Sequence, residues 1–281
     1  TEGGVNTMAL IELKQVAKSF GPRRVLDAVN LSVEEGEFVS IVGKSAAGKS
    51  TLMKLASGLA LPDKGEVLLD GKPIREFPRG AAIVFQNYSL LPWLSALENV
   101  LLAVESAFPE WGLSKRKEQA ARYLELVGLG KALEKRPGQL SGGMRQRVAI
   151  ARAFAVEPRV LFLDEPFGAL DALTRATLQM ELAKLCQEQK PKATALMITN
   201  SVDEAILLSD RILALSGSPA TLSSAMPVPL ARPRAADLMM HDEQAVRLKI
   251  QLTDFLTANQ NASASTRPAR SVMATAVPVE A

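Results

Sequence analysis

The feature that most constrains the fold is a glycine-rich segment that directly follows a short apolar run. Gly43, Gly48, Lys49 and Ser50 fit the pattern G-x-x-x-x-G-K-[ST], and they come after Phe38–Val42. In this pattern the glycines let backbone N–H groups converge on phosphate oxygens, and the next helix directs the positive end of its dipole at them. Lys49 would neutralise β- and γ-phosphate charge, and the Ser50 hydroxyl would ligate Mg²⁺. The segment therefore predicts a nucleotide site between a strand and a helix; a chance glycine-rich turn is the alternative.

The rest of the chain predicts an α/β fold around a parallel sheet. Apolar runs typical of buried strands alternate with helical patterns, and a mainly helical stretch over 87–155 is inserted between them. The predicted strands are Leu10–Phe20, Val29–Val33, Phe38–Val42, a hairpin over Gly65–Ile74 that turns at Asp70-Gly71, Ala82–Phe85, Val160–Leu163, Ala195–Thr199 and Ile212–Leu215. The predicted helices include Lys49–Leu59, Met144–Phe154, Thr174–Gln189 and an amphipathic His241–Leu256.

Two adjacent acids, Asp164 and Glu165, follow the apolar run Val160–Leu163. A carboxylate at the end of a buried strand beside phosphates suits binding to Mg²⁺ through water, so we assign that role to Asp164. Glu165 is then the candidate general base for the attacking water. The alternative is a pair of solvated acids at a strand end, which the phosphate loop upstream disfavours.

Ser141-Gly142-Gly143 opens the predicted helix Met144–Phe154. A hydroxyl, two unhindered backbone N–H groups and a helix N-terminus form an anion site that needs no lysine. A capped helix that merely packs is the alternative. Each glycine lowers helix propensity by about 1 kcal/mol, a cost that local folding does not require. The segment therefore favours a second element that faces phosphate.

Together these motifs resemble the ATPase subunit of an ATP-binding cassette (ABC) transporter, and the resemblance covers Leu10 to Leu215. It implies a P-loop NTPase fold with a RecA-like core, an N-terminal antiparallel β subdomain and an inserted helical subdomain at about 87–155. We expect the ATPase domain to span 9–235 and a helical extension to span 236–257. Residues 258–281, rich in Ala, Ser, Pro and Arg, are expected to be disordered.

The resemblance implies ATP and Mg²⁺ as cofactors and a site shared between two subunits. In the family, the Ser141–Gly143 segment closes over ATP held by the opposing subunit, and Asp171 lies at the same seam. Gln86 contacts Mg²⁺ and the attacking water, and Phe20 stacks on adenine; a polar strand end and a core aromatic are the alternatives. The implied nucleotide contacts are Phe20, Gly43, Lys44, Ser45, Ala46, Ala47, Gly48, Lys49, Ser50 and Thr51, with Ser141, Gly142, Gly143 and Asp171 at the partner's ATP. The implied metal ligands are Ser50, Gln86 and Asp164, and the implied catalytic residues are Glu165, Gln86, Asn200 and Lys49.

Two residues depart from the family pattern. Ala46 stands where relatives commonly carry glycine, which restricts the loop slightly. Asn200 stands where the family places a histidine that contacts the γ-phosphate and helps to align the water; the single histidine, His241, is expected at the surface. Asparagine has no titratable proton near neutral pH. We therefore hypothesise that the site around Lys49 binds ATP well but hydrolyses it slowly.

The composition leaves any membrane role to a partner. The 281 residues are 47% hydrophobic and 22% charged, which is ordinary for a globular chain. No apolar run reaches the ~18–20 residues of a membrane span. The single Cys186 forms no internal disulfide and no signal-peptide pattern opens the sequence, so we expect a reducing, cytosolic location. A net charge of +3 is too small to indicate nucleic acid as a partner.

The segment Asn87–Leu94 indicates the kind of transporter. It lies where the family receives a helix from the membrane subunit, and its apolar, aromatic character suits docking of a helix, although it could equally be core. Its Leu-Leu-Pro-Trp is similar to importers of nitrate, sulfonates, taurine and bicarbonate, and residues 101–105 and 169–175 look most like the nitrate/nitrite/cyanate branch. In that branch some transporters pair two different ATPases, and this chain would fit the shorter one.

The resemblance therefore implies an ATPase that drives nitrate or nitrite uptake from the cytoplasmic side of the inner membrane. Its expected partners are a second ABC ATPase, permease subunits that dock near Tyr88–Leu94 and, through them, a periplasmic solute-binding protein. A sulfonate, taurine or bicarbonate importer is the alternative. A soluble ABC ATPase of translation or DNA repair, and a nucleotide sensor without turnover, are further interpretations; Asn200 favours the sensor and Glu165 opposes it.

Overall fold

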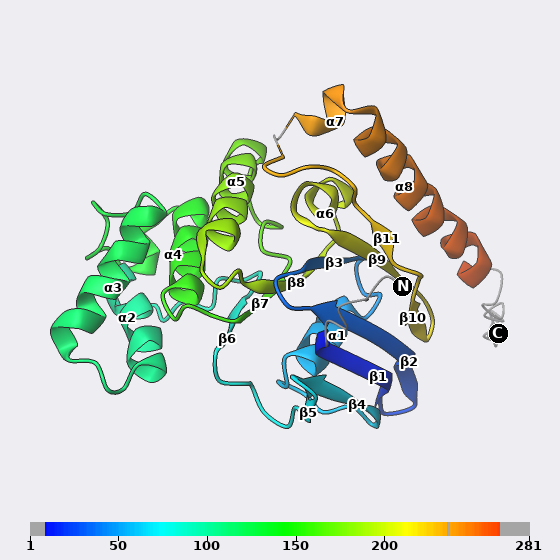
Figure 1. The fold of residues 1–281 in the computed structure, drawn as a ribbon, viewed down its shortest axis with the longest axis horizontal. Helices are drawn as coiled ribbons and strands as arrows, with labels where there is room; N and C mark the ends of the chain where they lie inside the picture. The colour runs from blue at the N-terminus through cyan, green and yellow to red at the C-terminus, as the bar shows by residue number, and fades with distance from the viewer. Residues whose placement is uncertain (1–8, 235–236, 265–281) are drawn as a thin grey trace, which may run out of the picture.

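The computed structural model describes residues 9–234 and 237–264, in which a mixed sheet carries helices on both of its faces (Figure 1). The order across the sheet is β5-β4-β1-β2-β10-β9-β3-β8-β7-β6, with β11 paired to β9. The strands are β1 (Ala9–Phe20), β2 (Arg23–Glu34), β3 (Phe38–Val42), β4 (Lys64–Leu69), β5 (Lys72–Pro73), β6 (Ala81–Val84), β7 (Val160–Asp164), β8 (Thr194–Thr199), β9 (Arg211–Gly217), β10 (Ala220–Leu222) and β11 (Met226–Pro227). The helices are α1 (Lys49–Ala56), α2 (Ala96–Ala107), α3 (Leu113–Leu126), the 3₁₀ turn η1 (Pro137–Gln139), α4 (Gly142–Phe154), α5 (Ala172–Glu188), α6 (Val202–Leu208), α7 (Leu238–His241) and α8 (Glu243–Ala264).

The parallel half of the sheet places the predicted site residues. Strands β9, β3, β8, β7 and β6 pair in parallel, and β3 and β8 are buried along their whole length. Continuous apolar runs are typical of strands covered on both faces. Because these strands run in one direction, the loops after β3, β6, β7 and β8 leave the sheet at one edge. The predicted parallel α/β core is confirmed.

The antiparallel half is formed by β5, β4, β1 and β2. Its β4–β5 hairpin turns at Asp70 and Gly71, with φ of 54° and 70°, as a tight hairpin requires, so that prediction is confirmed. The predicted strand Val29–Val33 is too short, since β2 begins at Arg23. Ala28 has a φ of +46° and the pairing with β1 shifts register there. This bulge interrupts the alternation from which the strand was predicted.

Helices α2, α3 and α4 form a lobe between β6 and β7 in the chain, at the left in Figure 1. Val100, Val104, Leu124, Val148 and Phe154 belong to one apolar cluster that continues onto the sheet. A reciprocal Ser–Glu capping box starts α2. The lobe is helical as predicted but less continuous, because residues 127–141 contain only the 3₁₀ turn η1. Its place between two sheet strands confirms the predicted helical insertion.

The C-terminal segment differs from the prediction of a single helix over His241–Leu256. His241 ends α7, and Asp242 starts α8 because its Oδ1 accepts a hydrogen bond from the Ala245 N–H at 2.9 Å. Helix α8 continues to Ala264, so residues 258–264 are helical and not disordered. The remainder of the predicted disordered tail, 265–281, lies outside the described residues.

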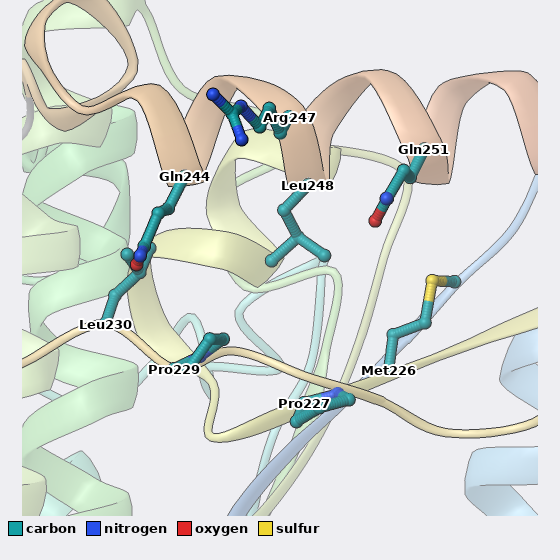
Figure 2. Close-up of a pocket in the computed structure, with 8 residues that line it drawn as sticks. All are labelled: Met226, Pro227, Pro229, Leu230, Gln244, Arg247, Leu248 and Gln251. Carbon is teal, nitrogen blue, oxygen red and sulfur yellow. The ribbon is translucent and has the colours of Figure 1, made fainter.

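Helix α8 is attached by a narrow apolar seam. Ala245, Leu248 and Leu252 are buried in a cluster that includes Val42 and Ile206, as the predicted amphipathic face requires. Beside this seam, α8 and the segment at β11 enclose an apolar groove of about 280 Å³ (Figure 2). The groove is lined by Met226, Pro227, Pro229, Leu230, Gln244, Arg247, Leu248 and Gln251, and it contains none of the predicted site residues.

Candidate functional site

The phosphate loop joins β3 to α1 and relies on two glycines. A Cβ on Gly43 would lie 2.8 Å from the carbonyl oxygen of Leu215, so no larger residue fits against β9. Gly48 caps α1 with a φ of 98°, a backbone conformation that glycine adopts readily and that residues with a side chain rarely adopt. Ala46 has a φ of +63°, which costs a residue with a side chain roughly 1–2 kcal/mol. This strain is the physical form of the restriction predicted for Ala46.

Lys49 lies at the centre of the site. Its side chain is only 4% exposed, and its ammonium donates to the Lys44 carbonyl at 2.9 Å and to Asn200 Oδ1 at 2.6 Å. The same nitrogen lies 3.3 Å from Glu165 Oε1. An ammonium has three donors, and here three oxygens surround it. Lys49 thereby connects the loops that follow β3, β7 and β8.

Asp164 and Ser50 meet beside the phosphate loop. The Ser50 hydroxyl donates to Asp164 Oδ1 at 3.4 Å. Burial raises the pKa of the Asp164 carboxyl, and the adjacent Glu165 charge raises it further. Hydroxyl and carboxylate oxygens are the ligands that Mg²⁺ accepts, directly or through water. The donor set therefore fits a magnesium ion, whose charge would favour the ionised carboxylate.

Glu165 is held in an unusual backbone conformation. Its φ is +46°, and its N–H donates to the Ile198 carbonyl at 2.9 Å. Strained residues of this kind cluster at functional sites. Gln86 reaches the same place from β6, since a Cβ on Gly168 would lie 3.3 Å from Gln86 Nε2 and 3.8 Å from Glu165 Oε2. Gly168, which sequence reasoning did not single out, leaves room for both side chains.

The loop that carries Asn200 is fixed by its neighbours. Ser201 caps α6 by accepting a hydrogen bond from the Glu204 N–H at 3.3 Å. Thr199 Oγ1 donates to Glu204 Oε2 at 2.6 Å, and burial raises the pKa of Glu204. Sequence reasoning missed Glu204, although an acid among the apolar residues of α6 was a usable signal. These bonds hold Asn200 against Lys49.

Ser141, Gly142 and Gly143 begin α4. The Ser141 hydroxyl accepts a hydrogen bond from the Met144 N–H at 3.2 Å. A Cβ on Gly143 would lie 2.4 Å from Thr174 Cγ2, so the close approach of α4 and α5 requires glycine there. Packing between two helices, and not local folding, is therefore one reason for glycine at position 143. The cap itself agrees with a phosphate-facing helix start and with simple packing alike.

We call Lys49 and the three residues around its ammonium, Lys44, Glu165 and Asn200, the Lys49 group. Asp171 and Phe20 lie apart from this group. Asp171 caps α5, and the hydrogen bond from the Thr174 N–H at 3.0 Å lowers the pKa of its carboxyl. Phe20 is 58% exposed at the end of β1, with Lys18 Nζ 5.9 Å from its ring centre, so it is not a core residue. Among the described residues, no hydrogen bond or ion pair joins Asp171, Phe20 or Ser141–Gly143 to the Lys49 group.

A groove of about 370 Å³ opens beside the phosphate loop. One wall is formed by Gly43, Lys44, Ser45 and Asn200, and the other includes Thr253, Leu256 and Thr257 of α8. No sequence motif predicted that the C-terminal helix would border this site. The contact follows from the buried apolar cluster in which Ala245, Leu248 and Leu252 of α8 pack with Val42.

Comparison with known proteins agrees with this arrangement. A protein-family model described as ABC transporter matches residues 26–168. The nitrate import ATP-binding protein NrtD of Synechococcus elongatus (strain ATCC 33912 / PCC 7942 / FACHB-805) is 47% identical over 91% of this chain and 94% of that protein. The chain belongs to the ABC transporter ATP-binding family. This ABC protein is accordingly an ATPase.

Further relatives support the same assignment. The bicarbonate transport ATP-binding protein CmpD of Synechocystis sp. (strain ATCC 27184 / PCC 6803 / Kazusa) is 44% identical over 91% of this ABC ATPase and 92% of its own length. Among solved structures, the ATP-binding cassette MJ0796 in a dimeric post-hydrolysis state with ADP and Pi matches with a TM-score of 0.69 and 32% identity. The match covers 79% of this chain and 100% of the MJ0796 chain.

Within the described parts of this ABC ATPase, every helix is too short or too polar to cross a bilayer.

Proposed function

We propose that this ATPase drives uptake of nitrate or nitrite across the inner membrane. The observation that carries the proposal is the 47% identity to a nitrate import ATP-binding protein over nearly the whole length of both chains. An importer of bicarbonate is the second candidate, since a bicarbonate transport ATP-binding protein of Synechococcus elongatus is also 47% identical, although over 84% of the chain. A sulfonate or taurine importer remains the wider alternative from the sequence motifs.

In the proposed site, the phosphate loop and Lys49 bind the triphosphate. Phosphate oxygens would compete with Glu165 and Asn200 for the Lys49 ammonium, which would free Glu165 to accept a proton. The exposed Phe20 ring is available to stack on adenine. The loop residues Lys44, Ser45, Ala46 and Ala47, together with Thr51 in α1, would complete the nucleotide contacts.

Ser50, Asp164 and Gln86 would hold Mg²⁺, which when bound neutralises charge on the transferred phosphate. Glu165 is the proposed general base, because its strained backbone aims its carboxylate at Lys49, where the γ-phosphate is expected. Gln86, beside Glu165, would orient the attacking water. Asn200 accepts a hydrogen bond from Lys49 at Oδ1 and carries no titratable proton near neutral pH, which supports slow hydrolysis at this chain's own site.

The rest of the site would come from a second subunit. Among the described residues, no hydrogen bond or ion pair joins Ser141–Gly143 or Asp171 to the chain's own Lys49 group, which supports a role for them at a partner's ATP. The dimeric MJ0796 cassette supports such an assembly.

The proposed permease contact is the segment Tyr88–Leu94. Trp93 is 64% exposed there, an unusual exposure for so large an apolar side chain. A helix from the membrane subunit would cover it, placing this ATPase on the cytoplasmic side of the membrane. The solute-binding protein would act through the permease and not touch this chain.

The test is reconstitution with the permease and solute-binding subunits in proteoliposomes. We expect ATP hydrolysis to rise when nitrate or nitrite is added on the binding-protein side. Stimulation by bicarbonate alone would instead favour the second candidate, and stimulation by taurine the third. An ATPase that responds to none of them but to nucleic acid would contradict the importer.

A further inference from the structure

The loop that follows Gln86 is held against α4 by one arginine. Arg152 donates from Nη1 to the Ser89 carbonyl at 2.6 Å and from Nη2 to the Tyr88 carbonyl at 2.9 Å. Both acceptors belong to residues with a left-handed backbone, since φ is +63° at Tyr88 and +46° at Ser89. Bulky residues rarely adopt this conformation. Two in succession indicate that tertiary contacts, and not local preference, hold the loop.

The Arg152 guanidinium depends on the same two carbonyls. It is half-buried, burial lowers its pKa, and within the described residues no carboxylate forms an ion pair with it. A buried charge needs hydrogen-bond partners, and a charged donor bonds a carbonyl more strongly than a neutral one does. The arginine and the strained loop therefore stabilise each other.

Tyr88 also connects the loop to the start of α4. A Cβ on Gly142 would lie 3.3 Å from the Tyr88 hydroxyl, so that side chain rests against the first turn of the helix. Arg152 lies ten residues further on, ~15 Å along the axis, and long side chains on a helix lean back towards its N-terminus. Tyr88 and Arg152 together fix the loop along most of α4.

We propose that Arg152 is a positioning residue that keeps Gln86 beside Glu165 and makes the Gln86 loop and α4 move as one body. A change at the chain's own nucleotide would then reach Ser141–Gly143 at the start of α4. The inference rests on the roles proposed above for Gln86 and for Ser141–Gly143. It adds the side chain through which the two are joined.

The test compares Arg152→Lys with the matched control Arg116→Lys. Arg116 is also half-buried in the helical lobe and also donates to two successive carbonyls, those of Phe108 and Pro109, far from any motif in the sequence. Lysine keeps the charge but loses the planar fork that binds two acceptors. In the assembled complex, we expect Arg152→Lys to lower kcat for ATP about tenfold with KM within about twofold. Amide exchange over residues 86–90 should also accelerate, and Arg116→Lys should change neither quantity.

A rescue variant separates positioning from folding. Glycine adopts the left-handed conformation without strain, so Ser89→Gly should reduce the loop's need for Arg152. In Arg152→Lys/Ser89→Gly we expect kcat to return to within about threefold of the parent, a coupling that a general folding defect would not produce. Additive losses in the double variant would overturn the proposal.

Gln86→Ala, measured in parallel, distinguishes the two ways to fail. If Gln86→Ala leaves kcat unchanged, the role proposed for Gln86 is wrong and the inference falls with it. If Gln86→Ala lowers kcat while Arg152→Lys matches Arg116→Lys in kcat and exchange, only the role of Arg152 is overturned.

Discussion

At the scale of single residues, the site brings charges of both signs into a small, largely buried volume. Lys49 is almost fully buried, and Asp164 lies next to Glu165 in a place where burial raises its pKa. Lys49 is paired with the opposite charge of Glu165, whereas the like charge of Glu165 disfavours the ionised form of Asp164. Three substitutions in and beside this site test which of its residues affect the stability of the fold and which affect ATP turnover.

Ala46→Gly should stabilise the protein. The substitution removes roughly 1–2 kcal/mol of left-handed strain and adds roughly 0.5–1 kcal/mol of chain entropy, so we expect a net gain of about 0.5–1 kcal/mol in the free energy of unfolding. Urea denaturation measures it. Ala47→Gly, where the backbone lies outside the left-handed region, is the control and should lose stability. Equal losses in both variants would mean that Ala46 is unstrained.

Asp164→Asn should raise stability at neutral pH and abolish turnover. Because its pKa is raised by folding, Asp164 keeps its proton to higher pH in the folded chain than in the unfolded one. Stability therefore falls as pH rises through the window that begins near ~3.9, the unfolded value. The variant lacks this fall, so its Tm advantage without nucleotide should vanish at acid pH and appear at neutral pH. ATP turnover should drop about a hundredfold or more. A lower Tm than the parent at neutral pH would contradict the argument.

Asn200→His should accelerate ATP hydrolysis in the assembled complex. An imidazole can donate to the γ-phosphate and help to align water, and groups of this kind contribute about a hundredfold or more. We expect at least a tenfold rise in kcat, because alignment only partly depends on this residue. Asn200→Gln lengthens the amide without adding an imidazole and should bring no gain. Turnover of Asn200→His equal to the parent would show that the missing imidazole is irrelevant.

At the scale of elements, the contact between α4 and α5 decides how the Ser141–Gly143 segment is presented. Gly143 packs against Thr174, in the first turn of a helix that Asp171 caps. The two predicted seam residues, Ser141 and Asp171, therefore sit at the starts of helices that touch each other. The family resemblance placed these two motifs at one seam, and the fold adds the contact between Gly143 and Thr174 through which their helices pack.

Gly143→Ala should destabilise the protein by about 1–3 kcal/mol, the usual cost of overpacking, because its Cβ would overlap Thr174 Cγ2. Thr174→Ser removes that methyl group, so the double variant should recover most of the loss in a urea titration. Gly142→Ala meets nothing closer than 3.3 Å and should cost less. If Thr174→Ser brings no recovery, the packing explanation for Gly143 fails.

At the scale of the whole molecule, the proposed site would be shared between two subunits. The Lys49 group lies where the parallel strands end, while within the described residues no hydrogen bond or ion pair joins Ser141 or Asp171 to it. Leu173, beside Asp171, is 80% exposed. Exposed apolar groups next to capped helix starts are consistent with a surface that a second subunit covers.

Glu165→Gln should trap an ATP-bound dimer. The amide cannot accept the water's proton, so ATP remains and holds the two subunits together. Light scattering should show a dimer with ATP and Mg²⁺ and a monomer with ADP. Adding Ser141→Arg places a bulky side chain in the seam and should restore the monomer. A Glu165→Gln chain that stays monomeric at saturating ATP would count against the shared site.

The sequence by itself determined the local parts of this protein: the phosphate loop between strand and helix, the acids at the end of β7, the capped start of α4 and the parallel core. These signals are short-range, because turns, caps and apolar runs depend on neighbouring residues. Family resemblance extended them to partners and cofactors. The predicted boundaries missed most at β2 and α8. Helix α1 also ends at Ala56, three residues before the predicted end, and α6, β10 and β11 were not predicted.

The tertiary structure alone decided which distant residues meet. Lys49 and Asn200 are separated by 151 positions, and Arg152 and Tyr88 by 64, yet each pair is joined by a hydrogen bond. Gly143 likewise packs against Thr174, and α8 lines a groove together with the phosphate loop. No local pattern encodes such pairs, because they form only when the whole sheet and its helices pack together.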